Sequence, residues 1–400
     1  MVALHLGRPP CLPLQHSPLT ASLGGRGTER KKMTEKIPMT NSSDHGGTIF
    51  AIARSLGIQS DELIDFSASI NPLGPAPGVQ EAVCSSFQRV LHYPDRESFE
   101  LRQALAGVHR VTIDNLVVAN GSTELIYLLP RILPGARGLI IAPAFSEYAR
   151  ALDRAGWQTE HLILSPDDGF ALSLEKLAEK LAEGFDLLFL CNPANPTGAF
   201  LPLTRIREVQ RLCRGAGTFL VLDEAFMDFR EGESAKGLIA ENGGGIVLRS
   251  MTKFFAIPGL RLGYAIGHVD VIRQCADQLE PWSVNTPAQI AGVASLTDAG
   301  YRGRTLRYVS TERAALAQGL ADLPGLATFP SAANYLLVEM RNGFTAAELR
   351  SRLLEKRILI RDCSNFQGLD GRYFRVAVRT GEENRRLLDA VGEVLQESSR

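Results

Sequence analysis

The sequence predicts an α/β protein with a large domain built on a mostly parallel sheet and a smaller C-terminal α+β domain. Three observations favour this fold class. The chain has 400 residues, which exceeds what one apolar core usually supports. From Asn115 onward, short apolar runs alternate with longer helical patterns, as they do in repeated βαβ units. After Pro287 the pattern changes to long helices and then to runs typical of strands in a separate sheet.

The expected strands of the large sheet are short apolar runs bounded by turn-forming residues. They are residues 116–119, 138–142, 161–164, 187–191, 219–223, 246–250 and 262–266. Helical patterns lie between several of these runs, for example at 122–129 and 204–215. The runs 333–339 and 372–378 are the expected strands of the second sheet.

These patterns divide the chain into four parts. Residues 1–38 are rich in Pro, Gly, Ser and Thr, and we expect them to be a disordered extension. Prolines interrupt the apolar stretch that a secretory signal requires, which favours a true start at Met33 or Met39 over a targeting peptide. The other three parts are an N-terminal arm, the large domain and the small C-terminal domain, at residues 39–72, 73–286 and 287–400.

The composition argues against several classes of partner. The chain has 43 basic and 44 acidic residues and a formal charge of −1, which gives no sign of binding to nucleic acid or to an anionic membrane surface. No apolar stretch approaches the roughly twenty residues that a membrane-spanning helix needs. The six cysteines are scattered singly, without the spacing of a metal site, so we expect no metal and a reducing, cytoplasmic location.

The strongest local signal is the segment SMTKFFAIPGLRLGY, which runs from Ser250 after an expected strand. Its lysine, Lys253, can form a Schiff base with an aldehyde cofactor, and burial beside cations would make the amine nucleophilic. Arg261 supplies a fixed cation for a phosphate, and the hydroxyls of Ser250 and Thr252 can add hydrogen bonds to it. For Lys253 taken alone, a solvent-exposed loop lysine is the alternative.

Two further residues fit a pyridine ring. Asp223 ends an expected strand, where open α/β sheets bind their ligands, and its carboxylate can keep a pyridinium nitrogen protonated. Asn195, in the loop 192–198 with the sequence NPANPTG, can donate a hydrogen bond to a phenolic oxygen. A helix cap is the alternative for Asp223 alone.

The start of the next helical pattern fits a phosphate group. Gly121, Ser122 and Thr123 follow a strand and open a helix, whose N-terminal N–H groups attract anions. A structural cap is the alternative for these residues. Phe145 follows the next strand and offers an aromatic plane for a ring to stack on, or else a core side chain.

Together these segments resemble the fold-type I enzymes that depend on pyridoxal 5'-phosphate (PLP) and have the aspartate-aminotransferase fold. The resemblance covers about residue 44 to the end. Within that group the chain is similar to the branch of the histidinol-phosphate aminotransferases and the L-threonine-O-3-phosphate decarboxylases. Three features make the decarboxylases the closer match: the arm motifs DHGG at 44–47 and DFSASINPLG at 65–74, Phe226 where aminotransferases usually have a tyrosine, and TKFFAIPG at 252–259.

The resemblance implies that Lys253 and Asp223 are the catalytic residues. It also implies a substrate site made of His45, Gly46, Asn71, Asn195, Arg361 and Arg375. Two arginines and a histidine suit a ligand with two anionic groups, although a surface ion pair is the alternative for either arginine alone. Tyr93 resembles a residue that reaches the cofactor phosphate of a neighbouring subunit, which implies a homodimer with shared sites.

The implied reaction is the decarboxylation of O-phospho-L-threonine to (R)-1-amino-2-propanol O-2-phosphate, the aminopropanol linker of cobalamin. One alternative is histidinol-phosphate aminotransferase activity, which uses the same cofactor with 2-oxoglutarate as acceptor. A second alternative is a catalytically silent relative that acts as a binding module.

Overall fold

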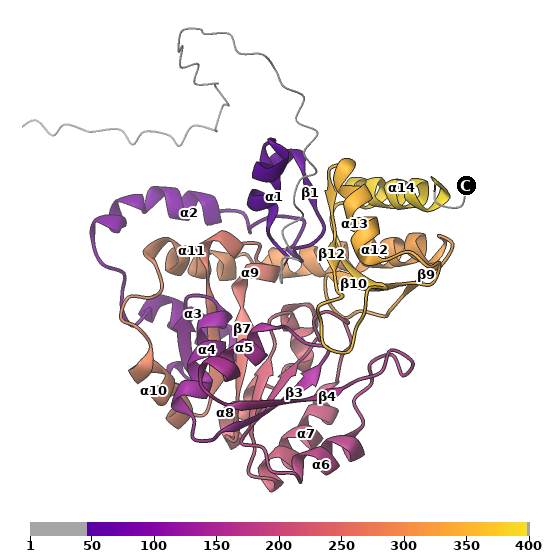
Figure 1. The fold of residues 1–400 in the computed structure, drawn as a ribbon. Helices are drawn as coiled ribbons and strands as arrows, with labels where there is room; N and C mark the ends of the chain where they lie inside the picture. The colour runs from indigo at the N-terminus through magenta and orange to yellow at the C-terminus, as the bar shows by residue number, and fades with distance from the viewer. Residues whose placement is uncertain (1–45, 398–400) are drawn as a thin grey trace, which may run out of the picture. The chain divides into compact units, whose positions relative to one another are not determined.

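The computed structural model describes residues 46–397, and His45 and the expected extension at 1–38 lie outside this range. In the described residues a seven-stranded sheet forms the centre of a large domain and a four-stranded sheet the centre of a smaller one (Figure 1). None of the helices in this range is both long and apolar enough to cross a membrane.

The large sheet has the strand order β2-β8-β7-β6-β5-β3-β4, and β8 runs antiparallel to both of its neighbours. Its strands are β2 Leu116–Ala119, β3 Arg137–Ala142, β4 Gln158–Ile163, β5 Leu187–Cys191, β6 Phe219–Asp223, β7 Gly245–Ser250 and β8 Gly263–Gly267. Each expected strand of this sheet is therefore confirmed. The largest difference is at β4, which begins at Gln158 rather than at residue 161. β4 is an edge strand with partly exposed side chains, so its first residues can be polar, and an apolar run does not mark where the strand begins.

Helices cover both faces of the large sheet. The α-helices of this domain are α2 Val79–Ser85, α3 Phe99–His109, α4 Ser122–Ile132, α5 Glu147–Arg154, α6 Leu174–Leu181, α7 Leu203–Gly215, α8 Lys236–Asn242, α9 Met251–Phe254, α10 Val269–Gln278 and α11 Thr286–Thr297. Short 3₁₀ helices occur at η1 Ser60–Glu62, η2 Phe87–Leu91, η3 Ile113–Asn115, η4 Met227–Glu233 and η5 Pro258–Leu260. Along β6, Leu220 and Leu222 belong to one apolar cluster and Val221 to another, because alternate side chains of a strand point to opposite faces. The helices predicted at 122–129 and 204–215 are α4 and α7.

The small domain has an antiparallel sheet in the order β12-β13-β10-β9. Its strands are β9 Leu326–Thr328, β10 Tyr335–Met340, β12 Arg361–Asp362 and β13 Tyr373–Ala377, and its helices are α12 Ala299–Ala321, α13 Ala346–Glu355 and α14 Gly381–Glu397. One face of the sheet packs its apolar side chains against these helices in a core of its own. The strands expected at 333–339 and 372–378 are β10 and β13.

The N-terminal arm is joined to the small domain. After α1 (Ile49–Leu56), β1 (Ile64–Asp65) pairs in parallel with β11 (Ile358–Leu359). Phe66 donates its N–H to the carbonyl of Leu359 at 2.8 Å and is fully buried in the small domain's core. Figure 1 shows this indigo segment beside the orange and yellow elements of the small domain.

The apolar cores divide the chain later than residue 286, where the sequence pattern placed the boundary. α11 packs against α2 and α3, and its Ala288 and Ala291 belong to the core of the large domain. In α12, Val309 belongs to that same core, whereas Leu316 and Leu320 belong to the small domain's core. The division lies inside α12 because one continuous helix carries both packing faces, so the change to long helices precedes the change of core.

Candidate active site

Most of the site residues predicted from the sequence surround one cavity of about 550 Å³, called here the site cavity. It lies at the carboxyl ends of the parallel strands, where ligands of open α/β sheets bind. The small domain and the N-terminal arm supply its other walls. The predicted residues that line it are Gly46, Gly121, Ser122, Thr123, Phe145, Asn195, Asp223, Ser250, Thr252, Lys253, Arg261, Arg361 and Arg375.

Lys253 lies in α9, the short helix that follows β7, and its partly buried side chain lines the site cavity. Burial lowers the pKa of Lys253 from 10.5 to about 8, and the nearby charges of Arg375 and Arg261 act in the same direction. A lower pKa leaves more of the amine neutral near neutral pH. The site therefore favours the nucleophilic form of this lysine.

Asp223 ends β6 and is buried against the wall of the site cavity. Tyr148 donates its hydroxyl to the Asp223 carboxylate at 2.6 Å, and the N–H of Ala225 donates to the same group at 2.9 Å. Burial raises the pKa of Asp223, whereas these two donors favour the ionised carboxylate. A buried carboxylate held in this way is suited to pair with a protonated ring nitrogen.

Tyr148 was missed by the sequence reasoning. It stacks on Phe189 with ring centroids 4.8 Å apart, so its position is fixed by packing as well as by the hydrogen bond to Asp223. The available signal was its spacing from Phe145, because residues three apart at the start of a helix lie on the same side. Phe145 is half-buried, lines the site cavity and meets Tyr148 edge-on.

A group of hydrogen-bond donors gathers at the N-terminus of α4. Arg261 lies so close to Gly121 that a Cβ atom there would be 2.8 Å from its Nη2. The hydroxyls of Ser250 and Thr252 are 2.7 Å apart and line the same cavity, as Ser122 does. Within residues 46–397, no carboxylate forms an ion pair with Arg261. This arrangement suits a phosphate dianion.

The small domain adds two arginines. Arg361 and Arg375 lie directly opposite each other on β12 and β13, and both are buried. Arg361 donates to Oδ1 of Asn365 at 2.8 Å, while Arg375 donates to the carbonyl of Ser67 at 2.8 Å and to Oδ1 of Asn195. Like charges directly opposite each other on neighbouring strands are unfavourable, so a bound anion would stabilise this pair.

Phe226 also lines the site cavity, and it packs edge-on against Tyr335 with ring centroids 4.9 Å apart. Its side chain has no hydroxyl group to offer to a cofactor oxygen. The apolar contact with Tyr335 explains how the structure accommodates a phenylalanine at this position.

Asn71, a predicted substrate contact, is not among the residues that line the site cavity. Its buried amide nitrogen lies within hydrogen-bond distance of Phe254 O, Tyr301 Oη and Thr305 Oγ1. These contacts occupy the side chain, and its backbone N–H donates to the carbonyl of Lys253 at 3.0 Å. Asn71 therefore supports α9 through Lys253 and Phe254, and its contact with a substrate stays a prediction.

Ser69 is one of several residues of this arm segment that line the site cavity, and sequence reasoning missed it. It is 2% exposed, and its Oγ has no hydrogen-bond partner within the described part of the chain. A buried hydroxyl without a partner in a cavity wall indicates a ligand contact. The sequence gives no signal here, since residues 67–72 form neither a helix nor a strand whose period would show which side chains face inward.

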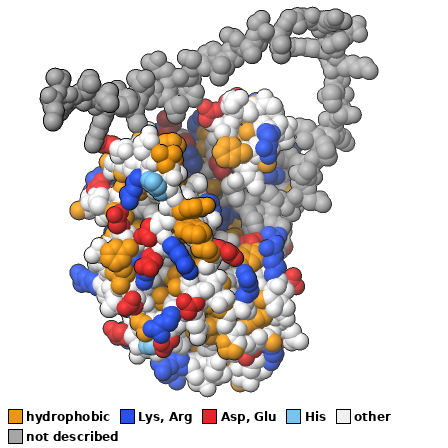
Figure 2. All heavy atoms as spheres, turned by 90° about the vertical axis from the view of Figure 1, so that its left-hand side faces the viewer, with side chains coloured by type: hydrophobic (Ala, Val, Ile, Leu, Met, Phe, Trp, Pro, Cys, Tyr) orange, Lys and Arg blue, Asp and Glu red, His pale blue; other side chains and the backbone are white. Residues whose placement is uncertain are grey.

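Tyr93 lies outside the site cavity and is 80% exposed. Its ring stacks on Trp282 with centroids 4.8 Å apart. Hydrophobic side chains gather in patches on the face that carries α2, α3 and α11 (Figure 2). The exposed hydrophobic residues near Tyr93 in the chain or in contact with it, called here the aromatic patch, are Phe87, Val90, Leu91, Tyr93, Phe99 and Trp282. A single chain does not test whether Tyr93 reaches a neighbouring subunit, so that role stays a prediction.

The site cavity contains the groups that PLP requires. It combines an amine of lowered pKa, a donor-rich phosphate site, a buried carboxylate and an aromatic side chain, at Lys253, Arg261, Asp223 and Phe145. Residues 46–397 contain no group of three or more His, Cys, Asp or Glu side chains arranged to hold a metal ion.

Residues 61–391 match the family described as aminotransferase class I and II. The chain is 41% identical over 356 residues to the threonine-phosphate decarboxylase of Salmonella typhimurium, which covers 88% of this chain and 97% of that protein. It is 29% identical over 358 residues to the adenosylcobalamin biosynthesis bifunctional protein CobDQ of Leptospira interrogans, which covers 88% of this chain and 41% of that protein.

Among the solved structures that share the fold of this chain, one is named for each of the two candidate activities. The histidinol-phosphate aminotransferase from Clostridium acetobutylicum gives a TM-score of 0.78 at 28% identity, covering 84% of this chain and 100% of that chain. The L-threonine-O-3-phosphate decarboxylase from Porphyromonas gingivalis gives a TM-score of 0.73 at 29% identity, covering 83% of this chain and 99% of that chain. Because the fold is common to both activities, the site has to distinguish between them.

Proposed function

The chain belongs to the aminotransferase class I and II family, and we propose that it is a PLP-dependent decarboxylase of O-phospho-L-threonine. The family confirms the predicted α/β fold and the PLP cofactor. The observation in the structure that carries the proposal is the opposed pair Arg361 and Arg375, in the same cavity as Lys253. A substrate with a phosphate and a carboxylate requires two such cationic groups beside the reactive amine.

When bound, PLP supplies an electron sink for the pair left at the substrate's Cα as carbon dioxide departs. Lys253 holds the cofactor through its amine, and Asp223 keeps the ring nitrogen protonated. Asn195 donates to the phenolic oxygen, and Phe145 offers a plane for the ring. The donors around Arg261 would hold the cofactor phosphate.

The substrate anchors decide which Cα bond breaks. Arg361, Arg375 and Ser69 bind the phosphate and carboxylate of the substrate, together with Gly46 and His45 of the arm. Binding energy from the phosphate, which does not react, would hold the substrate in the pose from which its carboxylate departs. Lys253 then returns a proton to Cα, and (R)-1-amino-2-propanol O-2-phosphate is released.

The released product would supply the aminopropanol linker in the synthesis of cobalamin. The similarity to a cobalamin biosynthesis protein supports this place. The proposal includes a homodimer, in which the aromatic patch is buried and Tyr93 reaches the cofactor phosphate of the partner subunit. It also includes a cytoplasmic location, which the described cysteines favour, since each is a thiol and not half of a disulfide.

The test is to incubate the PLP-loaded protein with O-phospho-L-threonine and to measure carbon dioxide, with histidinol phosphate plus 2-oxoglutarate run in parallel. We expect one carbon dioxide per substrate consumed and no glutamate in the parallel reaction. Glutamate without carbon dioxide would make the aminotransferase the correct function. A binding module would give neither product, although the absorbance band of its PLP could still shift with ligand.

A further inference from the structure

A second cavity lies behind the loop that carries Asn195. Its volume is about 540 Å³, close to that of the site cavity, and we call it the loop cavity. Cys191 lines both cavities, and residues 192–198 lie between them, with Asn195 on the side of the site cavity and Thr197 on the other. No predicted role in catalysis or substrate binding accounts for this space.

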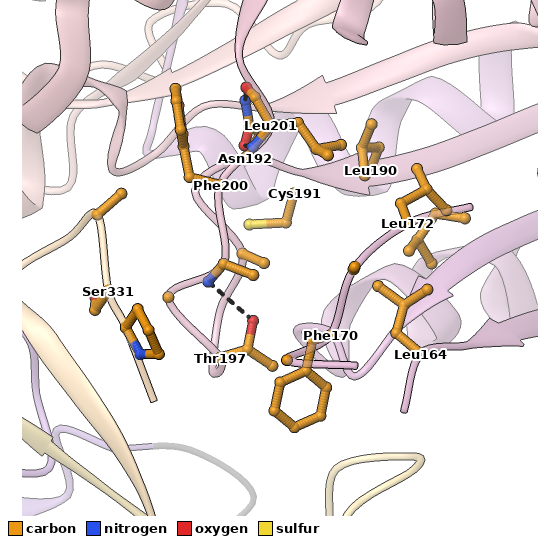
Figure 3. A pocket seen from close by; sticks show the side chains of 18 of the residues that line it. Leu164, Phe170, Leu172, Leu190, Cys191, Asn192, Thr197, Phe200, Leu201 and Ser331 are labelled. Carbon is orange, nitrogen blue, oxygen red and sulfur yellow. Dashed lines mark hydrogen bonds between the residues drawn. The ribbon is translucent and has the colours of Figure 1, made fainter. Parts of the chain in front are cut away.

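The walls of the loop cavity are mostly apolar. Leu164, Leu172 and Leu190 lie on one side of the opening and Ser331 on the other (Figure 3). The polar side chains of the loop are already engaged within it. Asn192 exchanges hydrogen bonds of 2.9 and 2.8 Å with the backbone of Leu201, and Thr197 Oγ1 accepts the N–H of Ala199 at 3.2 Å. An occupant would therefore meet a hydrocarbon surface.

The charged residues that line the loop cavity are Arg205 and Arg230. Arg205 donates to the carbonyl of Leu172 at 3.4 Å and lies 3.4 Å from Glu208. Arg230 lies over the ring of Phe200 at 5.5 Å and forms no ion pair within residues 46–397.

A third arginine adds to this positive charge. Arg313 donates to the carbonyl of Ala333 at 2.7 Å, next to the wall residue Ala332. Burial and the charge of Arg230 lower the pKa of Arg313, which does not itself line the loop cavity. The loop cavity is thus an apolar space with a cationic rim, which complements an organic anion.

The loop cavity also lies between the two domains. Its far wall, Pro330 to Ala332, leads into β10 of the small domain. Ala332 donates its N–H to the carbonyl of Gly198 at 3.0 Å, and the loop between the cavities contacts Arg375 through Asn195. A ligand in the loop cavity would touch both the back of this loop and the small domain.

We propose that the loop cavity is a second ligand site, which takes a small organic anion with an apolar body and contacts Arg230 through its anionic group. This inference goes beyond the proposed function and does not depend on the reaction. The ligand would bridge residues 192–198 and 330–332, so its binding would be coupled to that of the substrate.

The test uses 8-anilinonaphthalene-1-sulfonate, an aromatic body with one anionic group, titrated by fluorescence into the PLP-loaded enzyme. We expect saturable binding that Arg230→Gln weakens about fivefold, as loss of a charge-assisted hydrogen bond implies. Arg207→Gln is the matched control, because Arg207 is exposed on α7 and does not line the cavity, and it should leave the affinity unchanged.

Equal affinities of the two variants would overturn the proposal, as would the absence of saturable binding to the wild type. These readouts do not depend on turnover, so they are independent of whether the enzyme decarboxylates its substrate.

Discussion

At the scale of single residues, Tyr148 shows how the site controls a buried charge. Its hydroxyl is one of two donors to the Asp223 carboxylate, and burial acts against them by raising the pKa of that group. Any ring nitrogen paired with Asp223 depends on this balance. A residue one step removed from the cofactor thus sets the protonation state on which the chemistry rests.

We expect Tyr148→Phe to lower kcat about tenfold, which corresponds to about 1.4 kcal/mol. Loss of the donor raises the pKa of Asp223, so the acid limb of the kcat profile should move to higher pH. Profiles from pH 5 to 9 of the variant and of Tyr127→Phe, whose hydroxyl donates to Glu147 outside the cavity, measure this shift. An unmoved acid limb in Tyr148→Phe would show that the hydrogen bond does not control Asp223.

The pKa of Lys253 gives a second expectation. The neutral amine accumulates as pH rises through about 8, so incorporation of PLP into the apoenzyme should reach half its maximal rate near that pH. Arg375 contributes to lowering this pKa, and Arg375→Gln should therefore move the midpoint to higher pH. The absorbance of the bound cofactor follows the rate. Arg379→Gln, a loss of the same charge outside the cavity, should leave the midpoint in place, and equal midpoints in all three proteins would contradict this account.

Ser69 and Asn71 separate a ligand contact from a structural one. Ser69→Ala should raise KM for O-phospho-L-threonine about fivefold with little change in stability, since its Oγ has no partner in residues 46–397. Asn71→Ala should instead lower the free energy of unfolding by about 1–3 kcal/mol, because it removes buried hydrogen bonds. Substrate kinetics and urea unfolding of both variants test the pair. The reverse pattern would make Asn71, and not Ser69, the substrate contact.

At the scale of elements, regular patterns were predictable from the sequence and irregular segments were not. The buried strands β5 and β6 begin and end where their apolar runs do, because such runs have one low-energy environment in the middle of a sheet. Residues at strand ends, such as Asp223 and Ser250, could therefore be placed in the cavity. Ser69 and Asn71 could not be told apart, because their segment has no period and long-range contacts alone decide which side chain faces the ligand.

Tyr335 of β10 links the small domain to the loop of Asn195. Its hydroxyl donates to the carbonyl of Ala194 at 2.7 Å, and the guanidinium of Arg375 lies over its ring at 5.1 Å. One side chain thus positions a loop of the large domain and an arginine of the small one. It acts through Asn195 and Arg375, which makes it a positioning residue.

We expect Tyr335→Phe to raise KM about fivefold and to change kcat less, because the ring stays while the tie to the loop is lost. Initial-rate kinetics with O-phospho-L-threonine measure both constants. Tyr373→Phe is the matched control, since Tyr373 lies on neighbouring β13 and its hydroxyl contacts Glu339 instead of the loop. Equal KM values for the two variants would remove Tyr335 from the positioning of the site.

At the scale of the whole molecule, the two apolar cores explain why the site forms between domains. α12 belongs to both cores, and the N-terminal arm crosses from the cavity to the small domain through β1, which pairs with β11, and through Phe66 in that domain's core. The wall of the cavity that carries Arg361 and Arg375 is therefore tied to the rest of the chain at two places. Sequence patterns identified both domains but not that α12 contributes to both cores. A helix that packs on two cores has the same apolar period as a helix that packs on one.

The aromatic patch indicates that a second subunit packs against this chain. Leu91 is 77% exposed and Tyr93 is 80% exposed, which is unusual for large hydrophobic side chains so close together on a monomer. We expect the protein to sediment as a dimer and Leu91→Asp to shift it towards the monomer, since a buried carboxylate without a partner is unfavourable in an apolar interface. Ile163→Asp, at an exposed position on edge strand β4 outside the patch, should remain a dimer.

The Leu91→Asp variant also tests whether the sites are shared. If Tyr93 contacts the cofactor phosphate of the partner subunit, the monomer should bind PLP more weakly, and Tyr93→Phe should reproduce part of that loss while remaining a dimer. Sedimentation velocity and PLP titration of the same samples separate the two effects. A monomeric Leu91→Asp protein with wild-type PLP affinity would mean that each chain completes its cofactor site alone, because the donors around Arg261 would then be sufficient to hold the phosphate.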